Sequence, residues 1–316
     1  MTGNREKYPK IIQEPKTVEV FGREYIVYKF IFNGLTGLYN YLKSNPEINK
    51  NVFGREMASI NNDCSFAGKP YNQALEQLIN SNDQDYRNFL TISTKSQVKN
   101  LKRGAKFQST NSVAGGIVRP HALAVGDIKA YTTTKIIKTN SVVNIHAITN
   151  YLGYTTSDQV YNKAVILTNI IHALEKRGYK VNVNAFSASE VCGEIIDVDL
   201  NIKRNNAGVN YQALYRALCN VEFLRRIIFR VRETSDVKGD WSGYGRTISE
   251  KFAREYLKID KDDLYFGTPS ELGISGNDIS SDFENAVSKL GLDGMIDVER
   301  AKVLIKKSMD NNKKTL

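Results

Sequence analysis

The stretch from residue 142 to residue 186 most constrains the fold, because a long amphipathic segment lies between two short apolar runs. Residues 142–148 are mostly apolar, as is typical of a buried strand. Residues 158–177 then repeat apolar side chains at spacings of four and three, which predicts a helix. Residues 180–186 alternate valine or alanine with asparagine and predict a second strand. This order is typical of an α/β layer with a parallel sheet.

Residues 194–203 alternate again, with apolar side chains on one face and Asp197, Asp199 and Asn201 on the other. This pattern predicts a strand with one wet face, as expected at an antiparallel edge. Further elements are expected downstream: a helix over 211–218, a strand at the end of 224–233, a helix over 250–257, a strand over 263–266, a helix opened by a Ser281/Glu284 capping box, and a helix from Asp297 to Lys307. The predicted fold class is α/β, with a doubly wound, mostly parallel sheet and one antiparallel edge strand.

A small α+β region is expected before this layer. Residues 17–21 and 24–30 flank a glycine and predict a hairpin, and helices are expected over 35–42 and from Pro70 onward. From residue 94 the apolar pattern gives way to Ser, Thr, Asn, Gln, Lys and a glycine pair, which is typical of a loop. We therefore divide the chain into an N-terminal region (1–93), a basic linker or loop (94–140) and an α/β domain with a C-terminal helix (141–316).

Positive charge is concentrated in the middle of the chain. Residues 94–144 hold nine Lys or Arg residues and one acid, Asp127, so this segment is net +8 of a total of +10. The basic residues are Lys95, Lys99, Lys102, Arg103, Lys106, Arg119, Lys129, Lys135 and Lys138. Such a segment attracts polyanions, and its many amide and hydroxyl side chains suit phosphates and sugars. We predict that it binds an acidic partner, with nucleic acid as first choice and an acidic host or virion protein as second. Arg225, Arg226, Arg230 and Arg232 form a second cationic cluster, which joins the first only if the fold brings them together.

Several function classes find no support in the sequence. No stretch has the roughly 18 uncharged apolar residues of a membrane span, and the first residues lack the apolar core of a signal peptide. The three cysteines are widely spaced without a C-x-x-C pair, so no disulfide framework or zinc site is indicated. We expect a soluble protein of a bacterial cytoplasm, with virion association as an alternative, no cofactor and no membrane partner. The oligomeric state stays open, a homo-oligomer included.

Asp197 and Asp199 are the best enzymatic candidates. Alternate positions on a strand aim both carboxylates to one side, where they can share a divalent cation for nucleotidyl or phosphoryl transfer. That chemistry also calls for a Gly-Ser turn upstream, and Ser187 and Ser189 have no glycine before them. A solvated strand face is the commoner explanation, and no histidine pattern or nucleophile elbow is present. A non-enzymatic protein is therefore favoured, with the metal-dependent enzyme kept as an alternative.

The loop at residues 238–247 holds three glycines and the single tryptophan. Its glycine spacing matches neither a P-loop nor a dinucleotide fingerprint. Trp241, Tyr244 and Arg246 are instead suited to stacking on bases or to anchoring a protein partner. A mobile surface loop explains the same composition equally well.

Two resemblances add to these predictions. In its order of elements, the segment 141–291 resembles the von Willebrand A type of α/β domain, in which a helix follows the first strand and a hairpin supplies the antiparallel edge. That family binds a metal through Asp-x-Ser-x-Ser after the first strand, whereas residues 146–151 read His-Ala-Ile-Thr-Asn-Tyr. The segments Cys-Ser-Phe-Ala-Gly-Lys-Pro from residue 64, the helix start Gln-Ala-Leu from residue 73, and 166–181 look like an uncharacterised group of phage and prophage proteins. This second resemblance implies a mobile-element origin and adds two alternatives, a structural or assembly role and a host-inhibitor role.

Overall fold

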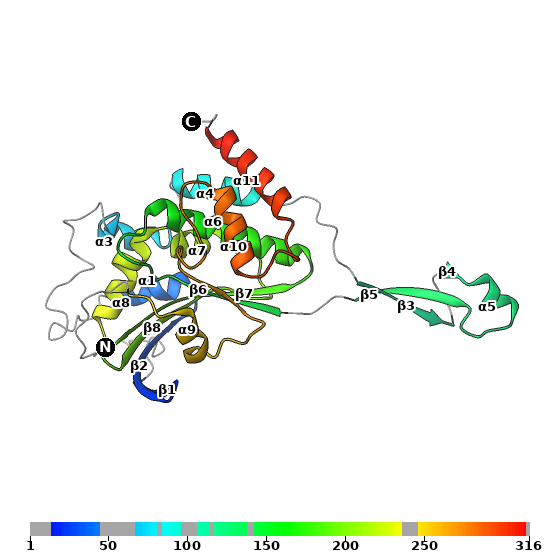
Figure 1. Cartoon of the computed structure of the whole chain (residues 1–316), viewed down its shortest axis with the longest axis horizontal. Helices are drawn as coiled ribbons and strands as arrows, with labels where there is room; N and C mark the ends of the chain where they lie inside the picture. Colours follow the sequence, from blue (N-terminus) through cyan, green and yellow to red (C-terminus); the bar gives the residue numbers. More distant parts are fainter. Residues whose placement is uncertain are drawn as a thin grey trace, which may run out of the picture.

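The computed structural model describes residues 14–44, 67–80, 84–95, 106–113, 117–137, 142–235 and 246–313. Its main sheet has six strands in the order β1-β2-β8-β7-β6-β9 (Figure 1). Their bounds are β1 Lys16–Val20, β2 Arg23–Phe32, β6 Val142–Ile148, β7 Lys180–Val191, β8 Glu194–Lys203 and β9 Leu264–Phe266. The pairs β1/β2 and β7/β8 are antiparallel, and β2/β8, β6/β7 and β6/β9 are parallel. The α/β class is confirmed, and the sheet is mixed.

Strand β8 lies inside the sheet, so the prediction that it is an edge strand is wrong. Its seven-pair parallel ladder with β2 runs from Ile26↔Glu194 to Phe32↔Leu200. The partner strand lies about 170 residues earlier in the chain, and local alternation of side chains carries no signal of such a pairing. The N-terminal hairpin β1/β2 is confirmed, but it extends the main sheet and does not form a separate region before it.

Most helices cover one face of this sheet (Figure 1). Helix α6 packs at the centre of that core, and Ile166, Leu167 and Ile170 have no exposed surface. The helices on this side are α1 Leu35–Lys43, α3 Tyr71–Gln77, α4 Gln84–Lys95, α6 Ser157–Lys176, α7 Tyr211–Leu218, the π-helix η1 Phe223–Ile228, α8 Phe229–Glu233, α10 Ile279–Lys289 and α11 Val298–Lys313. On the opposite face, α9 (Glu250–Tyr256) covers a smaller apolar cluster. None of the described helices is long and apolar enough to cross a membrane.

The central strand, helix and strand form where the sequence predicts them. Thr156 and Gln159 make a capping box that fixes the start of α6. The backbone nitrogen of Gln159 donates to the Thr156 hydroxyl at 3.2 Å. Gly178 ends the helix at φ +94°, a conformation that L side chains rarely adopt. The following hairpin turns at Cys192 and Gly193, both with positive φ.

Two local predictions are wrong. Residues 224–233 are helical in η1 and α8, although their Ile, Phe and Val content indicates a strand. The arginines between these apolar residues are also buried, so the segment is buried all round and shows no strand-like alternation. The cap of helix α10 is Asp278, three residues before the predicted Ser281, and it accepts hydrogen bonds from the backbone of Ser280 and Ser281. The predicted Asp297 cap of α11 is confirmed by a 3.1 Å hydrogen bond from the Arg300 amide.

A second sheet lies away from the main body (Figure 1). It has three antiparallel strands in the order β3-β5-β4. Their bounds are β3 Lys106–Ser112, β4 Ile117–Val118 and β5 Tyr131–Ile137, and the short helix α5, Pro120–Ala124, lies between β4 and β5 in the chain. We call the described residues 106–113 and 117–137 the arm. The expectation of a loop is wrong here, because threonine, tyrosine and isoleucine in β5 favour extended structure and pair with β3 over seven positions. The domain boundaries at residues 93 and 140 stay predictions.

Candidate functional site

Residues 118–130 form the folded end of the arm, which we call the cap. The Arg119 amide donates to the Ala130 carbonyl at 2.8 Å, and the Asp127 amide donates to the Ala122 carbonyl at 2.8 Å. Both alanines are buried, Ala122 within α5 and Ala130 directly before β5. Small side chains allow the backbone segments to approach closely, so the cap is held by backbone hydrogen bonds around a very small apolar centre.

The cap presents two of the predicted basic residues to solvent. The side chain of Arg119 is 40% exposed and lies 3.9 Å from the Asp127 carboxylate. The other Asp127 oxygen accepts a 2.9 Å hydrogen bond from the Lys129 backbone amide, not from its side chain. Arg119 and Lys129 against the single acid Asp127 leave residues 118–130 with a net charge of +1.

Two of the other predicted basic residues lie on the strands of the arm, and one lies on a helix of the body. Lys106 and Lys135 lie on β3 and β5, where the register pairs Lys106 with Ile137 and Lys135 with Gln108. Lys95 is the last residue of α4. Lys99, Lys102, Arg103 and Lys138 lie outside the described residues. The structure thus brings four of the nine predicted residues onto the arm, namely Lys106, Arg119, Lys129 and Lys135.

The cap also exposes aliphatic side chains that the sequence interpretation missed. Ile128 is 77% exposed, Val125 67% and Leu123 55%, and Val118 is exposed as well. Ile128 is the most exposed large apolar side chain among the described residues. A detectable signal was the set Val118, Leu123, Val125 and Ile128, whose spacings fit neither a helix face nor a strand face.

Asp197 and Asp199 form a charge cluster with Lys29 on the other face of the main sheet. The Lys29 ammonium lies 2.8 Å from Asp197 and 2.6 Å from Asp199, between the two carboxylates. Asp197 has no exposed surface and also accepts a 2.9 Å hydrogen bond from the Tyr256 hydroxyl. The expected solvated face is therefore wrong for Asp197, because β2 and α9 cover it. The lysine ammonium occupies the position that a shared divalent cation would take.

Burial dominates the titration of this cluster. It raises the pKa of Asp197, and the neighbouring charge of Asp199 adds to the rise, while Lys29 opposes it. Burial acts to lower the pKa of Lys29, but the two carboxylates outweigh it and the pKa rises. The pKa of Tyr256 rises through burial and through its contact with Asp197. The lysine is therefore held in its charged form and the phenol in its neutral form.

The same face of the sheet continues as a row of polar side chains across β8, β7 and β6. Asn184 donates to Asp199 at 3.3 Å, and His146 lies 3.7 Å from Asp263. Asn144 donates to Asp263 at 2.9 Å. Within the described ranges, no three His, Cys, Asp or Glu side chains are grouped so as to hold a metal ion. This row therefore forms a hydrogen-bonded ladder between strands.

The carboxyl end of β6 is filled by protein side chains. Open α/β sheets bind ligands at such an end, and the resembled von Willebrand A family places its metal there. Here the Asn150 amide donates to the Ala188 carbonyl at 2.8 Å and to the Arg246 carbonyl at 2.7 Å. The guanidinium of Arg232 donates to the Ser187 hydroxyl at 2.6 Å and to Asn150 at 3.3 Å. A buried arginine thus supplies positive charge at this end of the sheet.

The predicted loop site is described only in part. Trp241 and Tyr244 lie outside the described residues, while Arg246 is exposed and anchored through its backbone carbonyl. The second cationic cluster does not form a surface, because Arg225, Arg226, Arg230 and Arg232 are all buried. Arg225 and Arg226 donate to backbone carbonyls, those of Gly153 and Lys69 respectively. These arginines tie distant segments together and add no positive surface to the arm.

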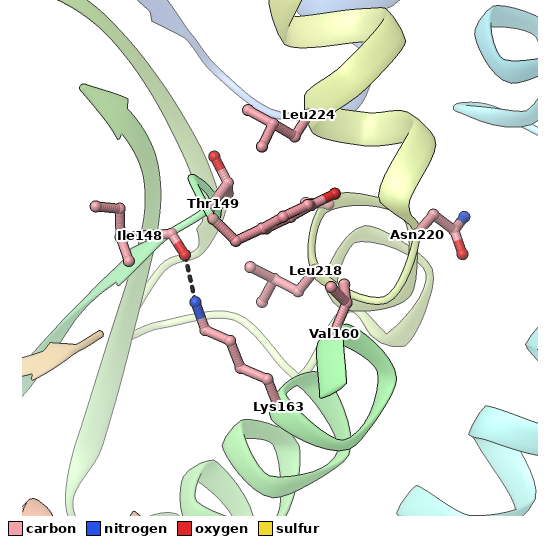
Figure 2. A pocket seen from close by; sticks show the side chains of 9 residues that line it. Ile148, Thr149, Val160, Lys163, Leu218, Asn220 and Leu224 are labelled. Carbon is pink, nitrogen blue, oxygen red and sulfur yellow. Dashed lines mark hydrogen bonds between the residues drawn. The ribbon is translucent and has the colours of Figure 1, made fainter. Parts of the chain in front are cut away.

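A small cavity lies beside this end of the sheet (Figure 2). Its lining is mainly apolar, and Lys163 donates from its ammonium to the Ile148 carbonyl across one side. Burial lowers the pKa of Lys163 to about 7, an effect that the charge of Glu271 partly opposes. The water-accessible volume is about 10 Å³, which is room for about one water molecule. This cavity is too small for a substrate.

The fold and its surfaces define an α/β protein with a mixed six-stranded sheet and a separate basic arm that ends in an apolar cap. The chain belongs to the family described as a domain of unknown function (DUF7192), whose model matches residues 13–294. No curated protein and no solved structure matches the chain. The family match covers both the sheet and the arm, so the arm is part of what the family model describes.

Proposed function

We propose that this chain is a non-enzymatic binding protein whose arm engages an acidic partner, nucleic acid first. The observation that carries the proposal is the arm itself, a separate sheet that lies away from the body (Figure 1). It belongs to a segment of net +8, which leaves only +2 for the rest of the chain. A positive projection reaches the phosphate backbone without bringing the near-neutral body into contact with it.

The composition of the arm supports this proposal. Its strands are rich in Thr, Ser, Asn, Gln and Lys, side chains that hydrogen-bond phosphates, sugars and bases. A β-ribbon also fits the major groove of B-form DNA. The buried apolar residues of its cap are two alanines, so its residues are better explained by what they contact than by a core.

Two finer assignments belong to the same proposal. The order β6, α6, β7, β8, with β7 and β8 antiparallel, supports kinship with the von Willebrand A type of domain. The buried Arg232 at the carboxyl end of β6 argues against ion-dependent binding by such a domain. The short segments that look like phage proteins support a phage or prophage origin, with the protein acting inside a bacterial cell.

The test is fluorescence-anisotropy titration of a labelled 30-base-pair duplex at several salt concentrations. The arm variant K106Q/R119Q/K129Q/K135Q removes four positive charges, and the control K180Q/K261Q/K289Q/K307Q removes four exposed charges from the body. We expect the slope of log K against log salt to become shallower by up to about 3.6 in the arm variant, because each lost phosphate contact contributes about 0.9. Equal slopes in the two variants, or no binding at low salt, would refute the proposal.

An assembly or host-inhibitor role is the second candidate, because a projecting arm with exposed aliphatic residues also suits contact with a neighbouring protein subunit. Size-exclusion chromatography with light scattering, before and after nuclease treatment, separates the two. Nucleic acid that co-elutes and is released by salt supports the first candidate. A nuclease-resistant oligomer of fixed mass, with a 260 to 280 nm absorbance ratio typical of pure protein, supports the second.

A further inference from the structure

The cap of the arm combines exposed aliphatic side chains with positive charge. Val125 and Ile128 lie between Arg119 and Lys129 in the chain, and both are more than three-fifths exposed. Burying an aliphatic side chain of this size is favourable by about 1.5 to 3 kcal/mol. Leaving several of them in water at the end of a projection is therefore costly unless a partner covers them.

The aliphatic side chains stand on an ordered backbone frame. The Leu123 amide donates to the Arg119 carbonyl at 3.0 Å, and the Val125 amide donates to the His121 carbonyl at 3.2 Å. The Asp127 amide closes the turn onto Ala122. A frame that is ordered before binding loses less conformational freedom when the side chains are inserted into a partner.

We infer that this cap is a wedge that inserts aliphatic side chains, Ile128 foremost, between stacked base pairs of duplex DNA. Arg119 and Lys129 hold the phosphates on either side of the opened step. Proteins that bend DNA insert leucine, isoleucine or similar side chains between base steps, and the basic residues beside the wedge wrap the bent duplex. This inference rests on the proposed function and adds a structural consequence, a bend in the bound duplex.

Charge and residue type favour duplex DNA over other partners. The positive charge of the cap complements a polyanion, and proteins with such wedges insert them from the minor groove of B-form DNA and bend the duplex toward its major groove. Protein hot spots and membrane-interface anchors are enriched in tryptophan and tyrosine. Residues 118–130 contain no phenylalanine, tyrosine or tryptophan. Aliphatic side chains with arginine and lysine fit an opened base step better than either alternative.

The test measures DNA bending by energy transfer between dyes at the two ends of a 30-base-pair duplex with a central TA step. The full-length protein is compared with V125S/I128S and with V303S, which removes a 64% exposed valine from α11. We expect the wild type and V303S to shorten the distance between the ends, as a bend of about 20 to 90° would. The cap variant should bind about tenfold more weakly, with an unchanged salt slope and without the bend.

The outcomes separate this inference from the proposed function. A wild-type protein that binds with a steep salt slope but leaves the duplex straight overturns the wedge and leaves the function standing. The wedge is also overturned, and the function also stands, if V125S/I128S bends the duplex as the wild type does. A wild-type protein that prefers duplex RNA of the same length has the same consequence. No binding to any nucleic acid, with flotation on phosphatidylserine vesicles that V125S/I128S loses, overturns both and assigns the cap to membranes.

Discussion

Removing the positive charge of Lys29 should destabilise the protein strongly, because Asp197 depends on it. Asp197 has no exposed surface, and its Oδ1 has no hydrogen-bond partner among the described residues. In Lys29→Met only the Tyr256 contact would remain. Breaking a buried ion pair by removing one partner costs about 3 to 5 kcal/mol. Because the Lys29 side chain is 25% exposed and water reaches the pair from that side, we expect about 3 kcal/mol.

The loss should depend on pH in a defined direction. Without Lys29 the pKa of Asp197 rises further above its value in the unfolded chain, since burial and Asp199 both favour the neutral acid. The folded state of the variant then binds more protons than the unfolded state, so its stability falls as pH rises through the range between these two pKa values. The free energy lost in K29M should therefore be larger at pH 8 than at pH 5.

Urea denaturation followed by circular dichroism measures the free energy of unfolding of each variant. The matched control is K180M, which removes an exposed lysine at the start of β7 and should change stability by less than about 0.5 kcal/mol. The double variant K29M/D197N neutralises the carboxylate and keeps an acceptor for Tyr256, so it should recover most of the loss. A change below about 0.5 kcal/mol for K29M would refute the reasoning, since it would mean that Asp197 does not need its cation.

Two further predictions concern buried polar groups. The folded-state pKa of Lys163 is about 7, against 10.5 for a free lysine, so the unfolded chain binds more protons between these values. Wild-type stability should therefore rise relative to K163M by about 1.4 kcal/mol per pH unit from pH 7 to 9, and parallel pH profiles would contradict this. Asp282 is buried and accepts from Asn162 at 2.9 Å and from the amides of Ser275 at 2.7 Å and Gly276 at 3.0 Å. D282A should cost about 3 kcal/mol, while D278A, which removes an exposed helix cap, should cost about 1 kcal/mol, and equal losses in urea would contradict the distinction.

The elements predicted correctly are those whose signal is local. Helix α6 carries its own cap, its apolar stripe and its terminal glycine, and β6 and β7 flank it at the short distances expected of a parallel crossover. The N-terminal hairpin follows from one glycine between two apolar runs. In each case the residues that decide the structure lie within about 40 positions of one another.

The wrong predictions for β8 and for the arginine cluster share a cause, which is a partner far away in the chain. Alternating aspartates predict a wet face for β8, but β2 brings Lys29 beside them from 168 residues away. The arginines of 225–232 indicate a charged surface, but they are buried, and backbone carbonyls 70 to 157 residues earlier in the chain accept the hydrogen bonds of Arg225 and Arg226. Burying a charge costs free energy, and the cost is offset only when the rest of the fold places partners beside it. The order of residues in one segment does not specify those partners.

The arm differs from the body in where its apolar side chains lie. In the body, apolar packing specifies the fold, and buried charges such as Asp197 have partners such as Lys29. In the cap of the arm, only Ala122 and Ala130 are buried, and larger aliphatic side chains point outward. Two buried alanines contribute little hydrophobic free energy, so aliphatic residues turned toward water must be explained by what they contact. A positive surface around them narrows that contact to an acidic partner with apolar surface of its own, and stacked bases between phosphates have both properties.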